Sequence, residues 1–159
     1  MFKLSGAVFI MGAAILTGMR INYSLNERKR ILSELLYFLQ AIEGKLRCMC
    51  MPLDCCFNES GSVFYEASIY IKNGDSPSQA IRKATEEMQY LKKEDKELLY
   101  NFSGGLTAED CAGQIANVQL LSKGLTLNLD EATKEAKLRG KLSVQGCTLL
   151  GAAAVILML

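Results

Sequence analysis

The residues best suited to bind a metal are four cysteines that lie close together in the chain. Cys48 and Cys50 precede Pro52, while Cys55 and Cys56 follow it. Thiolates gathered in this way are a donor set that zinc accepts. Their spacing differs from the paired C-x-x-C arrangement, however, and the sequence holds no second pair. We therefore interpret them as reduced, partly buried cysteines and predict no metal site.

Enzymatic chemistry is restricted by the amino-acid composition, because the chain contains 0 histidines. This excludes Ser-His and Cys-His nucleophiles and the two-histidine zinc protease motif. The run Ser103-Gly104-Gly105 lacks the lysine of a phosphate-binding loop and is interpreted as a helix break. Asp and Glu are scattered among Lys and Arg on what we interpret as solvated helix faces. We predict a non-enzymatic protein with no catalytic residue and no cofactor.

Nucleic-acid binding is also excluded as a function. The formal net charge is +1, and no basic patch with interleaved aromatic residues occurs. Such a patch is the electrostatic feature that nucleic-acid binders share.

Two uncharged stretches at the ends of the chain predict membrane-spanning helices. Residues 4–19 give sixteen uncharged positions between Lys3 and Arg20, or about 24 Å of helix. The flanking cations can extend outward to match a hydrocarbon core of about 30 Å. Residues 142–159 give eighteen further uncharged positions. A cleaved signal peptide at the N-terminus, and a buried core helix at either end, are the alternatives.

Small residues on both stretches predict that the two spans pack closely against each other. Gly6, Gly12 and Gly18 lie on the first span, and Gly146 and Gly151 on the second.

The distribution of Lys and Arg predicts the orientation. Basic residues follow the first stretch at Arg20 and at 28–30, and they precede the second at Lys137, Arg139 and Lys141. Because cytoplasmic flanks are rich in Lys and Arg, the middle is expected in the cytoplasm and both termini outside. Cysteines that stay reduced agree with this location. The predicted organisation is a span over 1–20, a cytoplasmic domain over 21–141 and a span over 142–159.

The middle of the chain is predicted to be all-α. Apolar residues recur at helical spacing up to Pro52, which predicts one long helix continuous with the first span. A second helix is expected from near Leu53 to Lys72, and a third starts at Ser76-Pro77, with a serine cap followed by proline. Helices over about 93–102 and from near Ala108 into the second span complete an antiparallel helical bundle.

In the order and spacing of its residues the chain resembles the stage III sporulation protein AB family of endospore-forming bacteria. The resemblance covers nearly the whole chain. The matching residues are Gly6, Gly18, Glu43, Pro52-Leu53, Asp95, Leu98, Phe102, Leu106, Asp110, Gln114 and Gly151. Two departures are Thr107, where the family usually has glycine, and Lys45, where a second glutamate is common.

The resemblance implies a mother-cell protein of the outer forespore membrane, in a channel-like assembly with a partner ATPase and other membrane components. It also implies similarity to the inner-membrane platform proteins of type II secretion and type IV pilus machines. On this hypothesis the bundle docks the ATPase through Glu43, Asp95, Asp110 and Gln114. The two aspartates are equally suited to capping helices.

Two other functions stay open at this point. One is a membrane protein that binds a small molecule or lipid between the bundle helices. The other is a secreted helical protein with disulfides. The sequence also leaves self-association into a homo-oligomer open.

Overall fold

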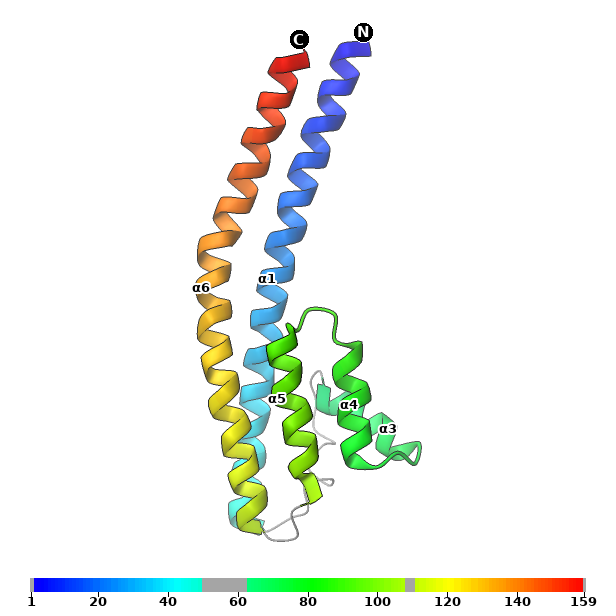
Figure 1. Cartoon of the computed structure of the whole chain (residues 1–159), viewed down its shortest axis with the longest axis vertical. Coiled ribbons are helices and arrows are strands. Elements are labelled where there is room, and N and C mark those ends of the chain that lie inside the picture. The colour runs from blue at the N-terminus through cyan, green and yellow to red at the C-terminus, as the bar shows by residue number, and fades with distance from the viewer. Residues whose placement is uncertain (1, 50–62, 108–110, 159) are drawn as a thin grey trace. The chain divides into compact units, whose positions relative to one another are not determined.

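The computed structural model describes residues 2–49, 63–107 and 111–158, and every regular element in these ranges is helical. The elements, labelled as in Figure 1, are α1 (Phe2–Met49), α3 (Val63–Lys72), α4 (Pro77–Glu87), α5 (Lys93–Gly104), the 3-10 turn η1 (Gly105–Thr107) and α6 (Cys111–Met158). No strand occurs within these ranges. The predicted all-α fold is therefore confirmed.

The two long helices each run without a break from a terminal stretch into the charged middle of the chain. Both α1 and α6 contain 48 residues. This confirms that the first and last helices are continuous with the terminal stretches. The predicted start of the second helix near Leu53 lies outside the described residues, and its end at Lys72 agrees with the prediction.

The chain divides into two compact units. Residues 1–29 and 131–159 form the first, which we call the hairpin unit, and residues 30–130 form the second, the bundle unit. In the hairpin unit the outer parts of α1 and α6 run antiparallel beside each other, with the two termini at the same end (Figure 1). In the bundle unit the inner parts of the same helices lie with α3, α4 and α5.

Local sequence determines where α4 begins. Gly74 has a φ of +98°, a conformation that glycine adopts without steric penalty. The Ser76 side chain then accepts a hydrogen bond from the backbone N–H of Gln79 at 3.4 Å, and Pro77 occupies the first helical turn. This confirms the predicted start, because the hydroxyl satisfies one of the free N–H groups of the first turn.

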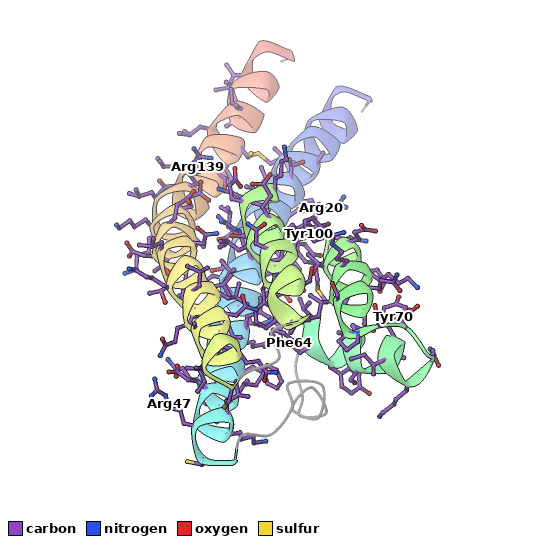
Figure 2. All side chains as sticks on the ribbon, turned by 60° about the horizontal axis from the view of Figure 1, so that its bottom comes forward. Arg20, Arg47, Phe64, Tyr70, Tyr100 and Arg139 are labelled. Carbon is purple, nitrogen blue, oxygen red and sulfur yellow. The ribbon has the colours of Figure 1, made fainter. Side chains whose placement is uncertain are left out.

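The core of the bundle unit comes from one face of each helix. Phe64, which is labelled in Figure 2, stacks its ring on that of Phe38 at 4.8 Å and meets the ring of Phe102 edge-on at 6.0 Å. Such aromatic pairs contribute about 0.5–1.5 kcal/mol each beyond their buried area. The residues of α1 predicted to face inward are all buried: Ile31, Leu35, Phe38, Leu39, Ile42 and Leu46.

The hairpin unit is packed through small residues in its outer part. A Cβ atom built on Gly151 would lie 2.9 Å from the Cβ of Ala14, so only glycine allows this approach. Gly18 is also buried. Among the side chains that the structure describes, none lies within 4 Å of such an atom on Gly6, Gly12 or Gly146. Close packing is thus confirmed at Gly151.

A partly buried ion pair joins α1 to α6 in the inner part of the hairpin unit. Nη1 of Arg28 lies 3.2 Å from Oε2 of Glu135, and their side chains are 4% and 16% exposed. The two residues are 107 positions apart in the sequence. The pair therefore connects α1 to α6 across almost the whole chain.

In the part of the chain that the structure describes, no helix combines the length and apolar character of a candidate membrane span. The spans predicted over 1–20 and 142–159 include the side chains of 1–5, 7–10, 144, 154, 155 and 157–159, which lie outside that part. The domain boundaries at residues 20 and 142 stay predictions.

Candidate partner-docking site

Glu43 links the two long helices at the surface of the bundle unit. Its Oε1 accepts a hydrogen bond from Nε2 of Gln119 on α6 at 2.7 Å, and another from Nη2 of Arg47 at 2.8 Å. The hydrogen bonds from Gln119 and then Arg47 hold the pKa of Glu43 below its ordinary value of 4.5. With 24% of its side chain exposed, Glu43 presents a carboxylate that is ionised at neutral pH.

Asp95 lies inside the bundle unit and has 0% exposure. Its Oδ2 accepts the backbone N–H of Lys92 at 3.0 Å, and its Oδ1 accepts Nδ2 of Asn128 on α6 at 2.7 Å. The first bond caps α5, whose first turn contains Asp95. The second fixes α5 against α6. Asp95 therefore has the capping role that its sequence position also allowed.

The other two predicted contact residues lie at the start of α6. Gln114 is half-buried, and Asp110 lies outside the described residues. Because Asp95 is buried while Glu43 is partly exposed, the described members of the set do not share one exposed surface. Whether any of them binds a partner stays a prediction.

The cysteines offer no grouped metal ligands in the described ranges. Among those residues, no three His, Cys, Asp or Glu side chains are placed to hold one ion. Cys48 is exposed, and the thiol of Cys111 donates to the carbonyl of Leu46 at 3.4 Å. Cys50, Cys55 and Cys56 lie outside the described residues.

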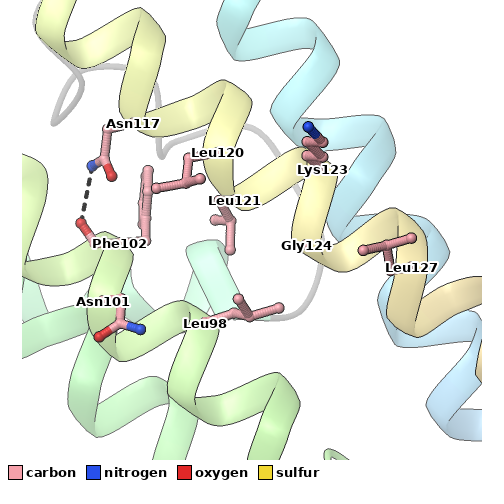
Figure 3. A pocket seen from close by; sticks show the side chains of 9 residues that line it. All are labelled: Leu98, Asn101, Phe102, Asn117, Leu120, Leu121, Lys123, Gly124 and Leu127. Atoms are coloured by element: carbon pink, nitrogen blue, oxygen red, sulfur yellow. Dashed lines mark hydrogen bonds between the residues drawn. The ribbon is translucent and has the colours of Figure 1, made fainter.

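A groove between α5 and α6 is the feature that the sequence interpretation missed (Figure 3). It has a volume of about 480 Å³, and its lining includes Leu98 of α5 with Leu120, Lys123 and Leu127 of α6. Leu120 and Leu127 are 70% and 69% exposed. In the sequence, the groove could have been found only from Leu120 and Leu127, which lie seven positions apart on an exposed face of α6.

Comparison with known proteins gives a consistent family assignment. The family model for stage III sporulation protein AB matches residues 3–159. A solved structure of a stage III sporulation protein AB is similar, with a TM-score of 0.58 and 22% identity over 69% of this chain and 96% of that chain. Among curated proteins, none matches the chain. The structural likeness shows a shared fold, and the family match confirms the resemblance found in the sequence.

Proposed function

The chain belongs to the stage III sporulation protein AB family, and from this membership we propose that it is a non-enzymatic, membrane-anchored scaffold that docks a partner ATPase in a sporulation channel complex. The family match over nearly the whole chain carries the sporulation-related role. The anchor, the orientation and the docking partner are proposals that rest on further observations.

The membrane anchor is supported by uncovered apolar side chains on the outer part of the hairpin unit. Leu16, Leu150 and Ile156 are 69%, 73% and 75% exposed. A soluble surface seldom gathers large apolar residues in this way. Immersion in lipid would cover them, while the close approach of Gly151 to Ala14 is the kind of contact that joins helices within a bilayer.

On α1 and on α6, the charged residues that border the apolar stretches lie at the same height along the hairpin unit. We expect the membrane surface at this height. A Cβ atom built on Gly140 would lie 2.6 Å from Oδ1 of Asn22, so these two positions are adjacent. Arg20 and Arg139 flank that contact (Figure 2). We propose that this basic level faces the cytoplasm of the mother cell, with both termini across the outer forespore membrane.

Cys48 allows a direct test of this orientation, because it is exposed on the bundle unit. In vegetative cells, where the expressed chain would lie in the cell membrane, a membrane-impermeant maleimide should label a variant that keeps only this cysteine poorly when the cells are intact and fully when they are permeabilised. A matched variant carrying Lys3→Cys as its only cysteine should be labelled in intact cells. Labelling of Cys48 from outside would reject the proposed orientation.

The docking proposal centres on Glu43, with Asp110 and Gln114 as further candidate contacts. Asp95 is buried and would act indirectly, by holding α5 against α6. Glu43→Lys should weaken binding of the purified ATPase in a pull-down with the full chain. Glu34→Lys is the matched control, since Glu34 also pairs with an arginine four residues away, Arg30. Equal loss in both variants would assign the effect to net charge, and no loss in either would remove Glu43 from the site.

A further inference from the structure

The groove between α5 and α6 is built by a close approach of the two helices. A Cβ atom on Gly124 would lie 2.9 Å from both Cδ atoms of Leu98, so glycine at this position lets Leu98 lie directly against α6. At another point on the two helices, Nδ2 of Asn117 donates to the carbonyl of Phe102 at 3.1 Å (Figure 3). The groove is therefore a defined part of the packing between α5 and α6.

The apolar side chains along the groove are arranged to meet a helix. Leu120 and Leu127 lie seven positions apart on α6, which is about 10.5 Å or two helical turns. Both line the groove and remain about 70% exposed. Apolar residues at this separation form the seam along which one helix packs on another.

The charge of the groove indicates what the incoming helix should carry. Lys123 lines the groove between the two leucines, and no acidic residue is among the lining side chains. In the part of the chain that the structure describes, Lys123 pairs with no carboxylate. A carboxylate on the occupant would complement this cation as the leucines become covered.

We propose that the groove receives an amphipathic helix of the partner ATPase, with large aliphatic residues about seven positions apart and an acidic residue facing Lys123. The inference rests on the proposed docking function and adds a second contact surface to that of Glu43. In this interaction, apolar contacts at Leu120 and Leu127 provide the affinity for the partner helix. The charge of Lys123 fixes the position of that helix along the groove.

Binding of the purified ATPase to the full chain in detergent micelles tests this directly. The double variant Leu120→Asn/Leu127→Asn should weaken binding by about tenfold or more, as expected for central interface residues. Lys123→Glu should also weaken it, and an acidic-to-lysine change in the ATPase helix should restore it. The matched controls Leu138→Asn and Lys137→Glu alter exposed α6 residues outside the groove and should stay within about twofold.

The outcomes separate this inference from the proposed function. If the unaltered chain does not bind the ATPase, both are overturned. If it binds and the groove variants bind equally well, only the groove assignment fails. If those variants instead abolish self-association of the chain, or release a co-purified lipid, with ATPase binding unchanged, the occupant is a second copy or a lipid and the inference is overturned. Circular dichroism should show unchanged helicity in every variant.

Discussion

Asp95 is a buried polar residue that joins two helices of the bundle unit. It has 0% exposure, and separate oxygens accept the Lys92 backbone N–H and the Asn128 amide. A buried carboxylate is tolerated only when hydrogen bonds replace the water that it loses. Here the same side chain begins α5 and connects it to α6, so one substitution affects both interactions.

Replacing Asp95 with alanine should lower the free energy of unfolding by about 2–4 kcal/mol, because a helix cap is lost and the Asn128 amide is left without its acceptor. Asn128→Ala should have a smaller effect, since the cap remains. Denaturant unfolding of the full chain in detergent, followed by circular dichroism, measures both. If Asp95→Ala changes the midpoint no more than Asn128→Ala does, the capping contribution assigned to Asp95 is wrong.

At the scale of the element, α6 contains an unsatisfied polar group, the buried hydroxyl of Ser122. In the described structure this oxygen has no hydrogen-bond partner. The neighbours of Ser122 on the same helix, Val118, Leu121 and Leu125, are buried apolar residues. The serine hydroxyl therefore lies in an otherwise apolar part of the core.

Ser122→Ala should therefore raise the free energy of unfolding by about 1 kcal/mol, because an unsatisfied polar group leaves the core and alanine favours helix. Ser103→Ala is the matched control. Its hydroxyl is also buried but donates to the carbonyl of Tyr100 at 2.7 Å. The control should be neutral or mildly destabilising. A stabilisation of equal size in both variants would point to helix propensity alone.

Elements whose signals are local were predictable from the sequence, whereas features that join distant segments were not. The start of α4 follows from Ser76 and Pro77, and the inward face of α1 follows from helical spacing. The burial of Asp95 depends on Asn128, which is 33 positions away. The groove likewise requires Leu98 to approach Gly124. Neither the Asp95–Asn128 nor the Leu98–Gly124 contact leaves a signal in the neighbouring sequence. The sequence alone could therefore not show that Asp95 is buried rather than part of a surface contact.

At the scale of the whole molecule, the chain places its beginning and its end in one unit. The Arg28–Glu135 pair lies within this hairpin unit, with Arg28 3% exposed, and Nη1 of Arg139 lies 3.7 Å from the same glutamate. A buried pair contributes little net stability compared with apolar residues of similar size, but losing one partner leaves a poorly solvated charge. We infer that the pair acts mainly by setting the register of α1 against α6.

Two variants test whether the Arg28–Glu135 pair aligns α1 with α6 along their length or only holds the two helices together. Arg28→Ala should lower the free energy of unfolding by about 2–3 kcal/mol, somewhat less than for a fully buried pair because Arg139 still partners Glu135. The double variant Arg28→Met/Glu135→Leu should recover most of that loss, since the charge that remains, on Arg139, is 73% exposed and stays solvated. With cysteines introduced at Asn22 and Gly140, which are neighbours in the native register, cross-linking should nevertheless fall in the double variant. Undiminished cross-linking would mean that the small-residue contact alone aligns the two helices.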